Sequence, residues 1–171
     1  MNEPGPAGIP RADYPVAVRL RRELLNHRGW PYPRWSLVEV RPQSQAEVDE
    51  LVRCTVVAEE GEARDLLWTG LRVRLNRSQA ETYWFNLQST RPSLFVVCRE
   101  DLDGGMVPVM VSADHDAASR EMEGDAEVFA TELPGALHDW LERFVVAHFR
   151  PREKGGGRRR RKPLDGGEPT R

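Results

Sequence analysis

Two stretches of this chain place an apolar side chain at every second position, and this spacing limits the available folds most strongly. In residues 16–21, valine or leucine at 16, 18 and 20 alternates with alanine and arginine, and residues 67–75 repeat the pattern. A period of two turns alternate side chains to opposite faces of an extended strand. Both stretches are therefore predicted to be strands with one buried face, so the fold must contain a sheet covered on that side.

Five more segments have strand character. β-branched and aromatic residues, which favour strands, are concentrated there. The segments are residues 35–41, 51–58, 94–98, 106–111 and 127–131. Between the first two strands of the chain, residues 26–34 contain a glycine and two prolines, so they are predicted to be a loop that packs back on the sheet. Residues 101–105 have the composition of a hairpin turn.

Three helices are predicted from capping residues and apolar spacing. Ser78 is expected to cap a short helix with Glu81 at its third position, and Asp114 is expected to cap one that ends at Gly124. The third helix follows Pro134 and has apolar side chains at helical spacing. These are Leu137, Trp140, Leu141, Phe144 and Val145, with His148 continuing the stripe. The elements predict an α+β fold with a mainly antiparallel sheet and about three helices, of which the last, amphipathic helix packs on the sheet.

The formal net charge of −2 conceals two unlike parts of the chain, whose 171 residues suit one domain. Residues 1–13 are rich in proline and glycine and are predicted to be disordered, and residues 14–149 are predicted to form a single α+β domain. Residues 150–171 carry nine basic and three acidic side chains, a net charge of +6 that leaves −8 for the rest. We therefore expect an acidic body with a basic, disordered tail joined through the glycines at 155–157.

The apolar runs are too short for a membrane span, because none approaches about 18 consecutive apolar residues. The first ten residues lack the basic and apolar segments of a secretory signal. A cytoplasmic location is therefore expected. Cys54 and Cys98 each lie in a strand-like apolar run, and both are predicted to be buried, reduced thiols.

The sequence contains no recognisable motif for catalysis, cofactor binding or metal coordination. It lacks a glycine-rich phosphate loop followed by lysine and serine or threonine, and it lacks a G-x-S-x-G nucleophile elbow. Its four histidines are scattered, and the one local ligand cluster, residues 114–116, is better explained by helix capping. No catalytic residue, metal or cofactor is predicted, and an enzyme is the less favoured class.

Two segments have the composition of interaction surfaces. The loop 27–35 holds aromatic and arginine side chains of the kinds enriched at binding hot spots, and the alternative is that they cover one edge of the sheet. They are Trp30, Tyr32, Arg34 and Trp35. The tail holds five consecutive cations. They are Arg158, Arg159, Arg160, Arg161 and Lys162.

Such a cationic run would bind an acidic protein surface, the acidic body itself or a nucleic acid, or would only keep the tail solvated. Nucleic acid is the weaker alternative, because a body with a net charge of −8 opposes the approach of phosphates. An acidic protein surface is therefore the expected partner of the tail.

Many aromatic, apolar and asparagine positions of the chain resemble an uncharacterised bacterial family, a domain of unknown function. They are Pro15-Val16-Ala17-Val18, Trp30, Arg34-Trp35, Trp68-Thr69-Gly70-Leu71, Tyr83-Trp84-Phe85-Asn86-Leu87, residues 92–97, residues 108–112, Trp140-Leu141 and the basic run. The resemblance spans about residues 14–162. Genes of that family are often found beside those for formate dehydrogenase. The resemblance therefore implies, at most, a helper in the assembly or maturation of a molybdenum-dependent formate dehydrogenase, and it supplies no catalytic residues.

The expected function is that of a non-catalytic accessory protein. It would bind formate dehydrogenase subunits or their maturation factors through the aromatic loop 27–35 and the basic tail. One alternative is a small-molecule or cofactor-binding enzyme whose pocket lies under that loop, with Tyr83, Asn86 and His148 converging on it. A second alternative is a nucleic-acid binder that acts through the tail. The sequence leaves the oligomeric state open.

Overall fold

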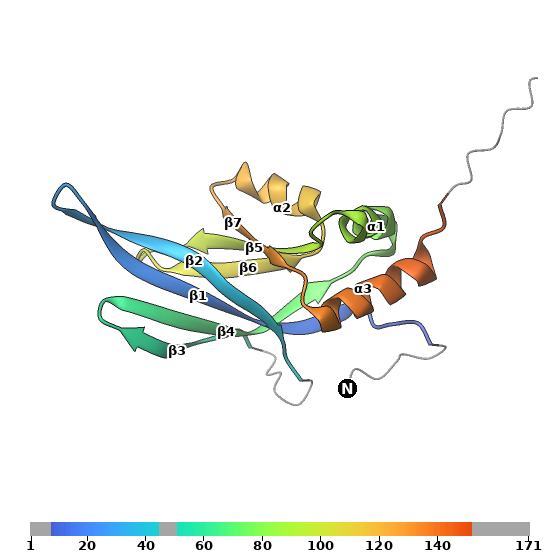
Figure 1. Cartoon of the computed structure of the whole chain (residues 1–171), viewed down its shortest axis with the longest axis horizontal. Helices are drawn as coiled ribbons and strands as arrows, with labels where there is room; N and C mark the ends of the chain where they lie inside the picture. The colour runs from blue at the N-terminus through green and yellow to red at the C-terminus, as the bar shows by residue number, and fades with distance from the viewer. Residues whose placement is uncertain (1–7, 45–50, 152–171) are drawn as a thin grey trace, which may run out of the picture.

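The computed structural model describes residues 8–44 and 51–151 (Figure 1). Its strands are β1 (Asp13–His27), β2 (Trp30–Pro42), β3 (Arg53–Glu60), β4 (Ala63–Arg74), β5 (Ser93–Glu100), β6 (Met106–Ser112) and β7 (Glu127–Glu132). Its helices are the 3-10 helix η2 (Arg77–Gln79) and the α-helices α1 (Ala80–Gln88), α2 (His115–Met122) and α3 (Gly135–His148). The α+β class, the mainly antiparallel sheet and the packing of the last helix on that sheet are confirmed.

The seven strands form one sheet in the order β2-β1-β4-β6-β5-β7, with β3 also paired to β4. β1 pairs with one edge of β4, and β3 and β6 therefore pair with different parts of the other edge. All pairs are antiparallel except β4 with β6, which are joined in parallel at Val73 and Val111 alone. We call this branching of the sheet the fork; it divides the strands into a β1–β4 half and a β5–β7 half.

Gly70 lies on β4 near the fork, against Leu51 and Val52, the two residues that precede β3. Thr69 and Gly70 together lie opposite Ala17 of β1, which makes a bulge, and Gly70 has a φ of +84°. A Cβ atom at this position would lie 2.5 Å from the carbonyl oxygen of Leu51. The Gly70 amide donates a hydrogen bond to the side-chain oxygen of buried Gln43 at 3.1 Å. Only glycine combines this backbone conformation with so close an approach.

The larger core lies between one face of the sheet and the helices α1 and α3. It includes Val16 and Val18 from β1, Val96 from β5, and Trp140 and Phe144 from α3, all at most 1% exposed. A smaller cluster lies under α2 on the other face of the β5–β7 half. It contains Val97, Ala118 and Ala126, with Phe95, Met110 and Val128 against it. β5 is therefore covered on both faces, which explains its continuous apolar run.

Arg11 and Ala12, just before β1, are tied to the body by hydrogen bonds. The indole Nε1 of Trp140 donates to the carbonyl oxygen of Arg11 at 2.8 Å, and the Leu75 amide donates to that of Ala12 at 2.7 Å. β1 itself begins at Asp13. No helix within the described residues is long and apolar enough to cross a membrane. The predicted basic tail beyond Pro151 lies outside the described residues.

The predicted loop 27–35 is wrong, because β1 and β2 continue through it as a hairpin. Arg28 and Gly29 alone form the turn, with φ values of +51° and +85°, the pair of positive angles that a tight type I′ turn requires. Pro31 and Pro33 are tolerated because β2 is the outer strand of the sheet, where a missing N–H breaks no ladder. The prolines therefore indicate an edge strand and not a loop.

Two smaller predictions also need correction. The cap before α1 is Asn76 and not Ser78: the Asn76 side-chain oxygen accepts from the Ser78 amide at 3.0 Å and opens η2, which leads into α1. Asp114 caps α2 as predicted, accepting from the amides of residues 116 and 117. Cys98 is fully buried as predicted, but Cys54 is exposed because it lies on the outlying strand β3.

Candidate interaction surfaces

The β1–β2 hairpin extends beyond the rest of the sheet (Figure 1). β1 pairs with β4 only as far as Arg22, opposite Arg64, and beyond that point it pairs with β2 alone. We call residues 23–34 the hairpin arm. A two-stranded hairpin with no covering layer is marginally stable in water. In the arm, both faces of the hairpin and the edge of β1 that no longer pairs with β4 are therefore open to a partner, whose binding would complete the packing.

The predicted partner-binding residues separate onto the two faces of the arm. Trp30, Tyr32 and Arg34 alternate along β2 and share one face, whereas Trp35 is on the other and packs against the larger core. Trp30 is 79% exposed and Tyr32 45% exposed. An indole this exposed has lost little of its hydration, so covering it would contribute strongly to binding. The structure thus brings three of the four residues together and assigns Trp35 to the body.

Ion pairs continue along the same face toward the body. Arg34 donates to Glu23 at 2.6 Å. Further in, Asp65 is 1% exposed and lies between Arg21, whose Nε donates to it at 2.6 Å, and Arg19, whose Nε donates at 2.9 Å. The hydrogen bonds from Arg21 hold the pKa of Asp65 below its usual range, against the opposing effect of burial. The ionised carboxylate fixes both guanidinium groups at the base of the arm.

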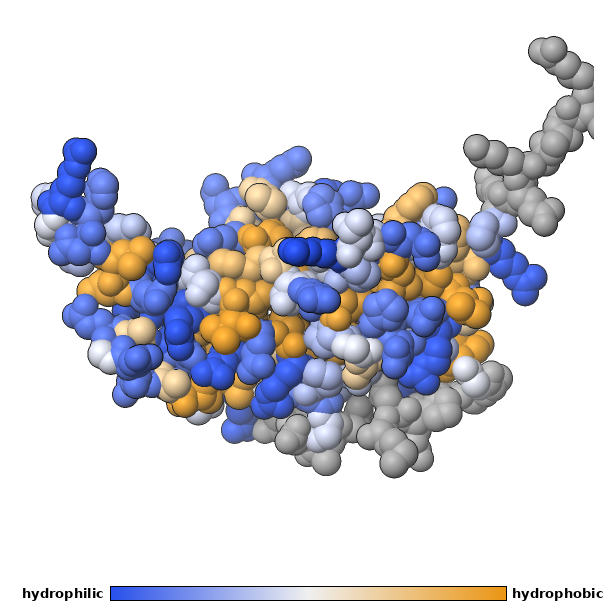
Figure 2. Space-filling view, viewed as in Figure 1, coloured by the Kyte–Doolittle hydropathy of each residue, from blue (hydrophilic) through white to orange (hydrophobic). Residues whose placement is uncertain are grey.

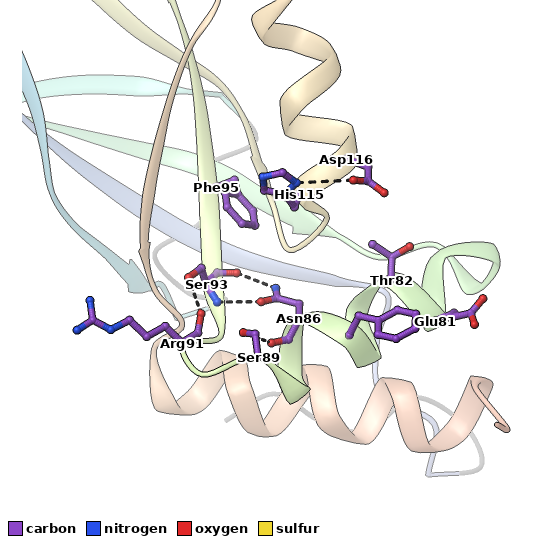
Figure 3. A pocket seen from close by; sticks show the side chains of 10 residues that line it. Glu81, Thr82, Asn86, Ser89, Arg91, Ser93, Phe95, His115 and Asp116 are labelled. Atoms are coloured by element: carbon purple, nitrogen blue, oxygen red, sulfur yellow. Dashed lines mark hydrogen bonds and ion pairs between the residues drawn. The ribbon is translucent and has the colours of Figure 1, made fainter.

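A hollow of about 490 Å³ lies between α1, the start of β5 and the start of α2 (Figure 3). We call it the α1–α2 hollow. Its aromatic lining comes from Phe85, which is 59% exposed, and from Phe95, whose ring meets that of His115 edge-on at 5.3 Å. Carboxylates and one guanidinium stand around it. These are Glu81, Asp116 and Arg91.

The three residues predicted to form a ligand pocket are not gathered around this hollow. Asn86 lines it, but its amide nitrogen donates to the carbonyls of Ser93 and Ala113 at 2.8 and 2.9 Å, and its oxygen accepts from the Ser93 amide at 2.9 Å. Figure 3 shows the bonds between Asn86 and Ser93. Asn86 therefore joins α1 to β5, and its donors and acceptor are already occupied.

Tyr83 and His148 instead pack against Phe144 of α3, with ring centroids 6.0 and 4.4 Å from it. The Tyr83 hydroxyl accepts from the Asn76 amide at 3.1 Å, and burial raises the pKa of this phenol. Burial, with a smaller effect of Arg77, lowers the pKa of His148. Tyr83 thus belongs to the contact between α1 and α3, whereas His148 packs on a ring of its own helix. Sequence patterns did not reveal the α1–α2 hollow, because three separate segments form it.

α3 also brings His138, Asp139 and Glu142 within 4.8 Å of one another. The three lie on one exposed turn, and such a group of acidic and imidazole side chains is common on helix surfaces without a metal. We assign no site to them.

Comparison with known proteins places the chain in a family. It belongs to the family described as "Protein of unknown function (DUF3305)", whose model matches residues 15–161. No curated protein and no solved structure matches the chain. The matched range covers the arm, the α1–α2 hollow and residues 158–161 of the basic run, so these parts belong to the family domain.

Proposed function

We propose that this protein is a non-catalytic accessory protein that binds a partner protein through the hairpin arm. The observation that carries the proposal is Trp30, 79% exposed at the tip of an arm that none of the described helices covers. Tryptophan, tyrosine and arginine are the side chains most enriched at binding hot spots. Trp30, Tyr32 and Arg34 present all three types on one face.

The partner's matching surface needs an apolar recess for the indole and carboxylates for Arg34 and the basic run 158–162. Arginine forks onto carboxylates with two parallel hydrogen bonds, which favours an acidic protein surface. The resemblance described above links the family's genes with those of formate dehydrogenase. We accordingly propose subunits of a molybdenum-dependent formate dehydrogenase, or their maturation factors, as the partners, and assembly or maturation as the role.

A binding protein is favoured over a ligand-binding enzyme by the state of the predicted pocket residues. Asn86 has its hydrogen-bonding groups engaged within the fold, and Tyr83 and His148 pack against Phe144. An enzyme site needs polar groups that converge on one cavity and remain free to contact a substrate. These three residues offer no such convergence.

The first test is co-purification from cells that express the enzyme. Trp30→Ala is expected to weaken recovery of the partner at least tenfold, because loss of a hot-spot tryptophan costs about 2 kcal/mol or more of binding free energy. Leu102→Ala is the matched control, since Leu102 is also a highly exposed apolar residue but lies in the turn between β5 and β6. Equal recovery with wild type and Trp30→Ala would disprove binding through the arm.

The second test addresses the role. Disruption of the gene is expected to abolish formate dehydrogenase activity in the cells, and wild-type protein but not Trp30→Ala is expected to restore it. Full enzyme activity in the disrupted strain would reject the maturation role while leaving the arm open to another partner.

A further inference from the structure

The chain leaves the last helix, α3, beside the α1–α2 hollow. Immediately after α3, the ring of Phe149 packs on Trp84 with centroids 5.4 Å apart. Trp84 in turn meets Phe85, a lining residue of the hollow, at 5.0 Å. One aromatic side chain, Trp84, therefore separates Phe149 from the lining of the hollow, and Pro151 follows two residues later.

The surface ahead of that point is apolar in its floor and acidic at its rim. Phe85 is 59% exposed although its ring meets that of Trp84. Glu81 and Asp116 are exposed carboxylates at the rim, and Figure 3 shows them on the helices α1 and α2. Beyond α2 the exposed carboxylates continue. They are Glu123, Asp125 and Glu127.

The chain carries the complementary charges directly after Pro151. Arg152 and Lys154 come first, with Glu153 between them, and the run 158–162 follows the three glycines. Residue 158 is seven residues beyond Pro151, a distance of about 25 Å when extended. By residue 162, eleven residues beyond Pro151, the extended reach is about 38 Å. α2, a helix of eight residues, is about 12 Å long. Arg91 supplies the one guanidinium of the lining, which has the charge needed for an ion pair with Glu153.

We propose that residues 152–162 of this same chain dock in cis along the α1–α2 hollow. Arg152 and Lys154 lie over Glu81 and Asp116, their aliphatic stems cover Phe85, and the run 158–162 meets the carboxylates that follow α2. Long basic side chains cover apolar surface in this way while their charges stay at the acidic rim. The proposal goes beyond partner binding by the arm and does not depend on it. The body's carboxylates and those of an acidic partner would compete for the run 158–162.

Docking can be measured in the full chain with a nitroxide label at residue 156. The variant Cys54→Ser, Gly156→Cys offers one accessible thiol, because Cys98 is fully buried and burial raises its pKa to about 12. The label is expected to broaden backbone amide signals of residues 81–89 and 115–125 at low salt. Adding Glu81→Gln and Asp116→Asn is expected to reduce this broadening at least threefold, as is 1 M salt, which shortens the Debye length to about 3 Å.

Glu59→Gln with Glu60→Gln is the matched control. These two carboxylates are also exposed and adjacent to a turn, but they lie on β3, so their neutralisation is expected to leave the broadening unchanged. Three results would overturn the proposal: no broadening on α1 and α2, stronger broadening around residues 59–62, or broadening that disappears when labelled protein is diluted with unlabelled protein. The last would show docking between molecules.

Discussion

Gly70 occupies the most constrained backbone position of the fork. Gly70→Ala adds a Cβ atom 2.5 Å from the Leu51 carbonyl oxygen at a φ of +84°. The left-handed conformation alone costs about 1–3 kcal/mol for a residue with a side chain, and the clash adds to it. The free energy of unfolding, measured by urea denaturation, is expected to fall by about 3 kcal/mol or more.

Gly61→Ala is the control for Gly70. Gly61 also has a positive φ, +58°, but a Cβ atom there meets nothing within 4 Å. Its cost is expected to be about 1 kcal/mol, the conformational penalty without the clash. Equal losses for the two variants would show that the contact with Leu51 contributes nothing.

The two cysteines differ in exposure, and therefore in reactivity. Cys98 is fully buried on β5 with a pKa of about 12, caused first by burial and then by Glu127. Cys54 is exposed on β3. Only a thiolate attacks an alkylating reagent. Iodoacetamide is expected to modify one thiol per native chain and two per chain in urea, and mass spectrometry should locate the native modification at Cys54.

Asp65 makes the stability of the arm's base depend on pH. Its pKa is lowered in the fold, mainly by hydrogen bonds from Arg21, so the ionised form stabilises the native state. This contribution is complete above the ordinary carboxyl pKa of 3.8 and is lost as the pH falls through the lower folded value. Asp65→Asn is expected to destabilise the protein at pH 7 and to differ progressively less from wild type below pH 4, measured by thermal unfolding. A difference between Asp65→Asn and wild type that stays constant as the pH falls would contradict this role of the carboxylate.

At the scale of elements, α1 is held to the sheet by Asn86. Asn86→Asp replaces the amide nitrogen by an oxygen that faces the carbonyls of Ser93 and Ala113. Losing two buried hydrogen bonds and opposing their acceptors is expected to lower the free energy of unfolding by about 3 kcal/mol. Gln88→Ala, an exposed change on the same helix, should alter it by less than about 0.5 kcal/mol. Chemical denaturation would contradict the bridging role if both variants matched wild type.

The elements that sequence patterns predict well are those with local causes. The apolar spacing of α3 and the uninterrupted run of β5 each arise from burial on known faces, and Asp114 caps α2 by bonding to amides two and three residues ahead. Local sequence patterns do not predict the hairpin arm. Its turn uses Arg28 with a positive φ, which side chains other than glycine and asparagine seldom adopt, and its prolines have the composition of a loop.

In the candidate sites, too, the sequence predicts what has a local cause and not what depends on distant contacts. Residue type alone marked Trp30, Tyr32 and Arg34, but their shared face depends on the pairing of β2 with β1. The α1–α2 hollow depends on contacts between segments more than 20 residues apart in sequence, such as the bond from Asn86 to Ala113. No local spacing encodes such contacts. Pattern analysis therefore identifies the side chains and not their arrangement.

For the whole molecule, side-chain packing and not the backbone ladder unites the two halves of the sheet. The halves share one parallel pair, Val73 with Val111, whereas the larger core draws residues from both halves and from α3. Figure 2 shows apolar side chains near the middle of the visible face and on the side of α1 and α3, with hydrophilic ones among them. α3 is thus the main connection between the halves.

Phe144 is the test of that connection. Phe144→Ala removes a ring that is 1% exposed and is expected to cost about 3–5 kcal/mol, destabilising both halves together. Val146→Ala on the same helix changes a side chain that is 74% exposed and should be nearly neutral. Hydrogen exchange would report the loss on β1 and β5 alike. Faster exchange confined to one half would show that the halves are held separately.

A one-pair junction also has a mechanical consequence. From Val16, which pairs beside the fork, to His27 at the tip of the arm, β1 extends through eleven residues, about 35 Å. A rocking of the β1–β4 half by about 5° against the other half would displace the tip by about 3 Å. It would strain one ladder pair, Val73 with Val111, together with the core packing that joins the halves. Because the arm extends far from the junction between the halves, a small rotation there displaces Trp30 further than it displaces a residue on the body.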